Sequence, residues 1–151
     1  MTTTAPTVNG RVIGVAHYAG RAVLENVLAR HDMTFQQQIT LRPVAEAEAP
    51  VERDGLVAQI ADALKTDTAD VHGIVEELAA KQLVATEGSK VLVTNAGRDL
   101  YAEVTGQTGK ISARIYAGIS AEDLAAAGRV LALVTERANA ELAVLVEQPR
   151  K

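Results

Sequence analysis

The chain has 151 residues, enough for one domain with a sizeable core, and 15 Lys and Arg against 19 Asp and Glu give a formal net charge of −4. Because the sequence has no cysteine, disulfides, thiolate zinc sites and thiol redox sensing are excluded. It has neither a basic, apolar leader nor an apolar run near the roughly 20 residues that a membrane helix needs. We therefore expect a cytoplasmic protein of bacterial type without a membrane partner.

The N-terminal part of the sequence predicts two helices. Apolar residues recur every three or four positions from Val8 to His31 and indicate a long first helix, in spite of three glycines. Thr34 is a suitable N-cap for a shorter second helix, which Pro43 should interrupt or end early. Residues 45–50, with the sequence AEAEAP, then look like a polar connection.

Two short amphipathic helices form the centre of the sequence. The first extends from Gly55 to Leu64, and the second follows Asp67, whose carboxylate should accept a hydrogen bond from the backbone N–H near Asp70. Each helix has apolar residues on one side, at a spacing of three to four positions. These residues are Leu56, Val57, Ile60, Ala61 and Leu64 in the first helix, and Val71, Ile74, Val75 and Leu78 in the second.

A short β-hairpin is predicted next. Residues 83–87 and 90–94 have the length and composition of brief strands, and Gly88-Ser89 between them suits a two-residue type II′ turn. A pair of helices followed by a hairpin is the arrangement of a winged helix-turn-helix. The hairpin is then its wing, and this wing is short.

Two long helices complete the chain. Thr94 should cap the first of them, and Gly118 is a good glycine for the end of that helix. Ser120 and Asp123 resemble a capping box at the start of the last helix. The last helix carries an apolar stripe that should pack on the first helix or on a second subunit. Its residues at heptad spacing are Leu124, Leu131, Ala138 and Leu145.

The sequence therefore predicts a mainly α-helical fold with a small β-hairpin wing. We expect a single domain over residues 1–151, with the winged helix-turn-helix at 51–100. Long helices at 8–32 and 104–147 should flank this lobe.

Three stretches of the chain resemble the MarR family of transcriptional regulators. Residues 59–65 (QIADALK) with residues 67–84 are similar to the family's helix-turn-helix. The sequence TNAGRDL at 94–100 is similar to the T-x-A-G-R-x-L entry of its fifth helix, and residues 115–124 to the turn into its last helix. With these motifs in order, the resemblance covers the chain from about Gly10 to Val146.

The resemblance implies a homodimer that binds double-stranded DNA at a pseudo-palindromic operator. The helices at 8–32 and 104–147 would be its dimerisation helices. The second helix of each helix-turn-helix would enter a major groove, and the wing would follow the backbone or the minor groove. A small aromatic or anionic effector would bind between the two lobes and change their separation. The residues expected at the DNA are Thr68, Ala69, Asp70, His72, Gly73 and Lys90.

Each of these side chains has a chemical role that it could fill at DNA. Thr68 suits a phosphate and Ala69 a thymine methyl group. Asp70 could accept from cytosine N4, although capping the helix is the alternative. His72 could donate to a base or a phosphate, or it could be an ordinary exposed histidine. Lys90 is the wing's basic residue.

Two departures from the family pattern weaken the prediction of DNA binding. The recognition helix has Gly73 where the family usually carries Arg, and Glu76 would approach phosphates with the wrong sign. The wing at 86–90 is shorter than the family's, and it has Lys90 as its only base in place of the usual Asp-x-Arg pattern. In addition, nine acidic residues stand against five basic ones between Val51 and Leu100. The alternative is a winged-helix dimer that has lost DNA recognition and binds a small molecule or a protein.

A ligand pocket is expected from the few aromatic residues and their basic neighbours, although each could equally be a core ring or a surface arginine. The expected lining residues are His17, Tyr18, Arg21, Phe35, Arg42 and Tyr101. The histidines lack the spacing of a metal site. Because no phosphate-binding loop or nucleophile motif accompanies them, we expect no cofactor, no metal and no catalytic residues.

Overall fold

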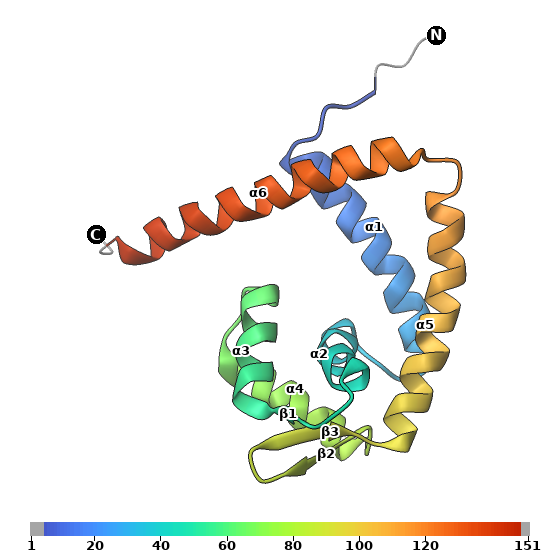
Figure 1. The fold of residues 1–151 in the computed structure, drawn as a ribbon, viewed down its shortest axis with the longest axis vertical. Helices are drawn as coiled ribbons and strands as arrows, with labels where there is room; N and C mark the ends of the chain where they lie inside the picture. The colour runs from blue at the N-terminus through green and yellow to red at the C-terminus, as the bar shows by residue number, and fades with distance from the viewer. Residues whose placement is uncertain (1–4, 149–151) are drawn as a thin grey trace. The chain divides into compact units, whose positions relative to one another are not determined.

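The computed structural model describes residues 5–148 (Figure 1). Within this range the order of elements is that of a helical protein with one small sheet. The elements are α1 (Gly10–Ala29), α2 (Phe35–Glu46), β1 (Val51–Glu52), α3 (Arg53–Leu64), α4 (Thr68–Ala80), β2 (Val84–Glu87), β3 (Lys90–Val93), α5 (Asn95–Tyr116) and α6 (Ala121–Glu147). The predicted mainly α-helical, winged-helix fold is confirmed.

The chain divides into two compact units, one up to Ile111 and one from Ser112 onward. The first unit holds α1 to β3 and most of α5, and the second holds the end of α5 and all of α6. None of the helices in residues 5–148 combines the length and apolar character needed to cross a membrane. The single domain expected from the sequence stays a prediction, and both of its ends lie outside the described residues.

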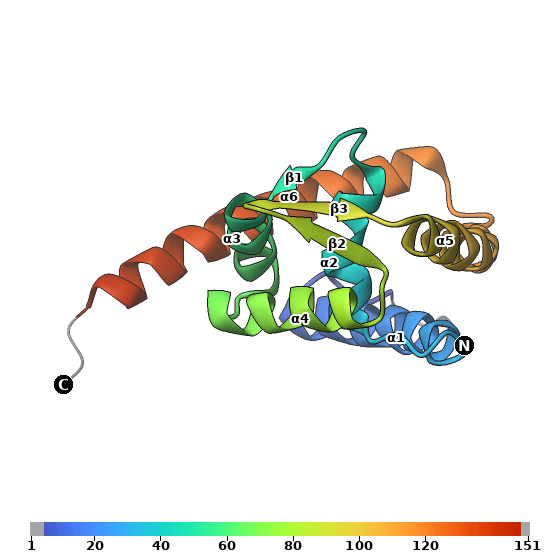
Figure 2. The same ribbon diagram turned by 90° about the horizontal axis from the view of Figure 1, so that it is seen from below.

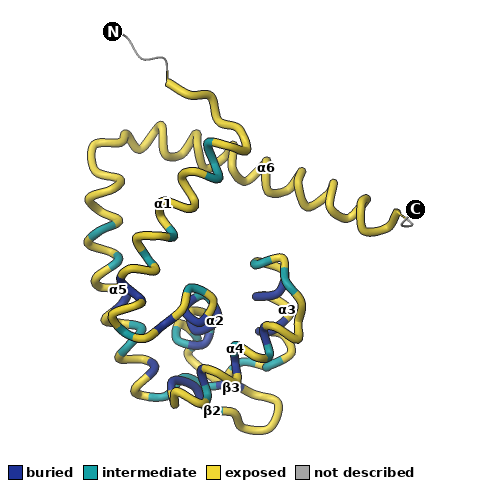
Figure 3. The backbone as a smooth tube through the Cα atoms, turned by 180° about the vertical axis from the view of Figure 1, so that it is seen from behind, coloured by how far each residue is buried: buried dark blue, intermediate teal, exposed yellow. Residues whose placement is uncertain are grey.

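The core of the first unit is aliphatic and lies where α2, α3, α4 and the strands meet (Figure 3). Each of these helices turns its apolar side inward, as the spacing predicts. The most deeply buried aliphatic residues are Leu28, Leu41, Val57, Val71, Val75, Leu78, Val91 and Val104. This core fixes the position of α4 relative to the wing.

Side-chain caps set the starts of α1 and α2. The Asn9 side chain accepts a hydrogen bond from the Val12 N–H at 3.0 Å, so α1 begins at Gly10 rather than at Val8. Thr34 and Gln37 form a reciprocal capping box at the start of α2. The predicted Thr34 cap is confirmed.

The expected effect of Pro43 is wrong, because α2 continues through it to Glu46. Val44 is only 3% exposed and Ala45 packs against the core. Burial of these side chains offsets the backbone hydrogen bond that a proline inside a helix removes. Residues 45 and 46 thus belong to the helix, and the connection to the sheet is shorter than the sequence indicates.

The sheet has three antiparallel strands in the order β1-β3-β2, and not only the predicted two (Figure 2). The hairpin of β2 and β3 is confirmed, with Glu87 opposite Lys90 and a positive φ of 59° at Gly88. The missed strand, β1, pairs Val51 with Val91. It was not predicted because two residues are too few to show an alternating pattern.

The start of α5 is built around Thr94 and Gly97. The Thr94 hydroxyl accepts from the Gly97 N–H at 3.0 Å and donates to the Gln82 carbonyl at 2.7 Å, which confirms the predicted cap. A Cβ atom on Gly97 would lie 2.0 Å from the Leu83 carbonyl oxygen. The glycine of the TNAGRDL sequence is therefore required by close backbone packing between α5 and Leu83, the residue directly before β2.

In the second unit, α6 begins at its predicted cap and has an exposed apolar side. Ser120 Oγ accepts from the Asp123 N–H at 3.0 Å, and Gly118 before it has a φ of 81°. All residues of α6 are exposed in the single chain (Figure 3). The large apolar residues among them are Leu124, Val130, Leu131, Leu133, Val134, Leu142, Val144, Leu145 and Val146.

Candidate nucleic-acid interface and adjoining cavity

Helices α3 and α4 form the helix-turn-helix, and a left-handed residue closes the first of them. Lys65 has a φ of 54° and a ψ of 49°, and the Thr66 N–H donates to the Ala61 carbonyl at 3.0 Å. Asp67 stands at the N-cap position of α4, but within the described chain its carboxylate accepts no capping hydrogen bond. The predicted Asp67 cap is wrong in this respect. A side-chain hydrogen bond at this turn is instead donated by Thr66 Oγ1 to Asp70 Oδ2, at 3.0 Å.

Four of the predicted DNA-contacting residues share the outer face of α4. Thr68, Ala69 and Gly73 are exposed, and His72 is half-buried. A side chain added at Gly73 would meet none of the described residues within 4 Å. The outer face of α4 is therefore open next to His72, because Ala69 and Gly73 have only a methyl group or no side chain there. Asp70 lies instead on the side of α4 that lines a cavity.

His72 and Glu76 are not free on this face, because Arg53 from the first turn of α3 reaches both. Arg53 Nε donates to His72 Nδ1 at 3.2 Å, and an Arg53 Nη lies 2.7 Å from Glu76 Oε1. The acceptor role of Nδ1 leaves the imidazole proton on Nε2. The charge of Glu76, which the sequence places against phosphates, is thus balanced by a neighbouring guanidinium.

Sequence reasoning missed Arg53, because the predicted helix began two residues later, at Gly55. A signal was present in the run Glu52-Arg53-Asp54 directly before the apolar pattern, where a lone base stands between two acids. A helix start at Arg53 would have placed that base beside the recognition helix.

The wing's basic residue also has an acidic neighbour. Lys90 Nζ lies 3.7 Å from Glu52 Oε1, and its side chain is 53% exposed. Ser89 Oγ donates to Glu52 Oε2 at 3.0 Å, and the Arg53 N–H donates to the Ser89 carbonyl at 2.8 Å. These bonds fix the wing's turn against β1 and the start of α3, so that Lys90 and Arg53 belong to one surface.

Lys81, at the end of α4, is held by the turn between α1 and α2. Its Nζ donates to the Asp32 carbonyl and, at 3.0 Å, to Gln37 Oε1. Gln37 in turn donates from Nε2 to Glu77 Oε2 at 2.9 Å. These contacts tie the C-terminal half of α4 to the start of α2 and occupy the Lys81 ammonium group.

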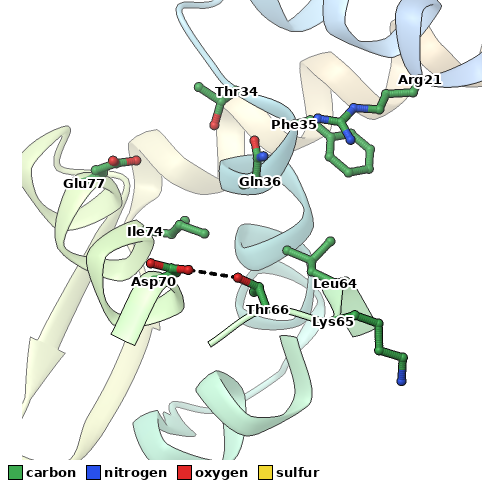
Figure 4. Close-up of a pocket in the computed structure, with 10 residues that line it drawn as sticks. All are labelled: Arg21, Thr34, Phe35, Gln36, Leu64, Lys65, Thr66, Asp70, Ile74 and Glu77. Atoms are coloured by element: carbon green, nitrogen blue, oxygen red, sulfur yellow. Dashed lines mark hydrogen bonds between the residues drawn. The ribbon is translucent and has the colours of Figure 1, made fainter. Parts of the chain in front are cut away.

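A cavity of about 580 Å³ lies beside α4, on the side that carries Asp70, Ile74 and Glu77 (Figure 4). Its walls come from α1, the start of α2, the turn after α3, and α4 itself. The lining residues are Arg21, Thr34, Phe35, Gln36, Leu64, Lys65, Thr66, Asp70, Ile74 and Glu77. Because Asp70, Ile74 and Glu77 lie on one side of α4, the same helix bounds the cavity and carries the outer face.

The six predicted ligand residues fall into two groups. The Arg21 guanidinium lies 4.2 Å from the centre of the Phe35 ring. The His17 ring makes edge-to-face contacts, with its centre 6.5 Å from the centre of the Phe35 ring and 5.3 Å from the centre of the Tyr18 ring. Of these four, Arg21 and Phe35 line the cavity. Most of the lining residues, from α2, the turn and α4, were missed because they carry no aromatic or cationic signal.

Arg42 and Tyr101 form the second group, away from the cavity lining. Tyr101 Oη donates to Glu46 Oε1 at 2.5 Å. Burial, with a smaller effect from the Glu46 carboxylate, raises the pKa of the Tyr101 hydroxyl, while Arg42 opposes this shift. The two residues thus connect α5 to the end of α2. Across the described residues 5–148, no cluster of three His, Asp or Glu side chains could hold a metal ion.

This geometry defines a winged helix-turn-helix protein with long flanking helices. Neither protein-family models nor curated protein sequences match the chain. Solved structures do match it, and they include a MarR-family transcriptional regulator from Rhodococcus sp. RHA1 with a TM-score of 0.67 and 17% identity. That match covers 81% of this chain and 88% of the other.

Two further structures support the same likeness. The reduced form of MarR from E. coli matches with a TM-score of 0.65 and 18% identity, over 86% of this chain and 95% of the other. CouR from Rhodococcus jostii RHA1, bound to p-coumaroyl-CoA, matches with a TM-score of 0.63 and 17% identity, over 94% of both chains. The chain therefore has the fold of MarR-family transcriptional regulators.

Proposed function

We propose that this chain is a DNA-binding transcriptional regulator of the MarR type. The observation that carries the proposal is the position of α4, which buries one side in the winged-helix core and presents Thr68, Ala69, His72 and Gly73 outward. A helix exposed in this way next to a wing is the element that enters a major groove in such folds. The fold shared with MarR-family regulators supports the same role. The protein would act by binding, without catalysis, in the bacterial cytoplasm.

The regulator is proposed to act as a homodimer on a pseudo-palindromic operator. Its α6 exposes aliphatic side chains such as Leu131 and Leu145, which are 42% and 62% exposed in the single chain. Contiguous apolar surface of this kind marks an interaction site in soluble proteins. A two-fold dimer would present two copies of α4, and the distance between them would set the half-site spacing.

A small aromatic or anionic effector is proposed as the signal. The Arg21–Phe35 pair offers a cation and a ring at one end of the cavity, and α4 forms the opposite wall. The CouR structure, which holds p-coumaroyl-CoA, supports ligand binding by this fold. An effector would change DNA affinity by binding unequally to the conformations that fit and do not fit the operator.

A second candidate function is a winged-helix dimer without DNA recognition, which binds a small molecule or a protein. The sequence of α4 favours it, because there is no Lys or Arg between Thr68 and Ala80 and Glu76 lies on the outer face. Arg53 balances the charge of Glu76, so the pair adds no net positive charge for the phosphate backbone. The two functions differ in whether DNA is retained at all.

Fluorescence anisotropy with labelled DNA separates the two functions. The labelled duplex is the region directly upstream of the protein's own coding sequence, and a scrambled duplex of equal length is the control. A regulator retains the upstream duplex and prefers it to the scrambled one. Equal or absent retention of both duplexes at low salt would contradict the regulator and favour the second function.

A further inference from the structure

Arg53 brings a cation to the outer face of α4, although it belongs to another helix. It stands at the first position of α3, and its backbone N–H is bound to the Ser89 carbonyl in the wing's turn. Its side chain is 22% exposed and extends to His72 and Glu76. The backbone of Arg53 is therefore held at the wing's turn, while its guanidinium is held by two residues of α4.

The partner of Arg53 shows which chemistry this position accepts. A guanidinium binds carboxylate and phosphate oxygens with the same planar set of donors. Glu76, at 68% side-chain exposure, occupies the guanidinium from the solvent side. Since its carboxylate reaches Arg53 from an exposed position, a phosphate oxygen can approach along the same direction and replace it.

The shape of α4 brings DNA within reach of Arg53. On the outer face of α4, Ala69 and Gly73 carry no long side chain beside His72 and Glu76, and the space next to Gly73 is open among the described residues. A duplex can therefore approach this backbone more closely than it could approach a helix with an arginine at that position. At such a close approach, Arg53 on α3 can make the phosphate contact that an arginine on α4 would otherwise make.

We propose that Arg53 contacts a DNA phosphate beside the recognition helix, and that Glu76 competes with this phosphate in the free protein. His72 orients the guanidinium through Nδ1 and keeps its Nε2–H free to donate to the duplex. The inference rests on the proposed DNA-binding function. It adds that the positive charge of the recognition surface comes from α3, and that an acid on α4 weakens binding.

The first test removes the charge of Arg53. Arg53→Gln should weaken binding of the upstream duplex at least about tenfold, because a charge-assisted hydrogen bond is lost in each subunit. It should also reduce the salt slope by about 2 per dimer, since each lost phosphate contact changes the slope by about 0.9. Arg30→Gln, which removes the same charge from an exposed position at the end of α1, is the matched control and should change binding less than twofold.

The second test removes the competitor and leaves Arg53 in place. Glu76→Gln should tighten binding at least threefold, and this gain should vanish in the Arg53→Gln background. Asp62→Asn is the control, because it also removes an acid from the helix-turn-helix and also releases a cation, Lys65, at 3.2 Å. The control should change binding less than twofold. Thermal unfolding of every variant shows whether it folds, and Glu76→Gln tests the proposal without altering Arg53.

The outcomes separate this inference from the proposed function. If the natural chain retains the upstream duplex specifically and Arg53→Gln binds equally well, the inference is wrong and the function stands. Equal tightening by Glu76→Gln with and without Arg53 would also overturn it, because Glu76 would then act as a general negative charge. If the natural chain does not retain the duplex, the proposed function falls and the inference falls with it.

Discussion

Helices α4 and α6 are both rich in aliphatic residues, but they use them differently. In α4, Val71, Val75 and Leu78 are at most 1% exposed, because α2, α3 and the sheet cover them. In α6, all residues are exposed in the single chain, and Leu131 retains 42% of its surface. The same residue types therefore stabilise the fold in one helix and leave an uncovered surface in the other.

The difference shows which parts of the sequence specify the fold and which are available for a partner. The aliphatic side of α4 is used within the chain, so only its outer face remains for DNA. The aliphatic side of α6 is available for a second subunit. Substitutions in the two helices should accordingly affect different measurements.

The largest effect is expected from Leu78→Ala in α4. Because Leu78 is 1% exposed, the substitution removes buried methyl groups and leaves a cavity. We expect the free energy of unfolding to fall by about 2–5 kcal/mol. Denaturant unfolding at fixed protein concentration measures this loss. A loss below about 0.5 kcal/mol, the range of surface substitutions, would contradict the described core.

Gly97→Ala should come next, since the added Cβ would lie 2.0 Å from the Leu83 carbonyl oxygen. Either α5 or the backbone at Leu83, directly before β2, must shift, which should cost about 1–3 kcal/mol of stability. Denaturant unfolding measures the cost. Gly109→Ala is the control, because its Cβ would meet none of the described residues within 4 Å, and it should be neutral or stabilising.

Leu131→Ala tests whether the apolar side of α6 forms an interface between two subunits. Its side chain is exposed in the single chain, so the substitution should affect association more than the packing of the winged-helix unit. We expect the dimer dissociation constant to rise about tenfold, which corresponds to about 1.4 kcal/mol. Sedimentation velocity over a dilution series measures it. Glu136→Ala, also on α6, is the control, and equal effects of both would contradict an interface at the apolar side.

The smallest effect is expected from Gly73→Ala on the outer face of α4. The new methyl group meets none of the described residues within 4 Å, and alanine is the better helix former. Stability should rise by about 0.5–1 kcal/mol, as measured by thermal unfolding. A loss of stability would show that the outer face of α4 is covered, and would break the contrast between its two sides.

The elements that could be predicted from the sequence are those set by local signals. Thr34 and Thr94 cap helices through bonds three residues away, and Gly88 provides the positive φ of the hairpin. Asp67 shows the limit of such signals, because it occupies the cap position and does not make the expected bond. Where a side chain has several possible partners nearby, the folded geometry decides which hydrogen bond it makes, and the residue type alone does not predict that geometry.

What could not be predicted depends on contacts between distant segments. Pro43 stays inside a helix because Val44 packs on residues from other elements, and β1 exists only by pairing with β3. Arg53 reaches His72 across 19 positions of sequence. The DNA-contacting residues expected on α4 stay a prediction, and Arg53 was missed because its side chain comes from another helix.

The most direct test of the account is the salt dependence of binding to the upstream duplex. Affinity measured by anisotropy from low to physiological salt gives the slope of log K against log salt. We expect specific retention with a steep negative slope, because each neutralised phosphate contributes about 0.9 to it. A flat slope, or equal retention of the scrambled duplex at every salt concentration, would contradict the claim that the outer face of α4 binds DNA.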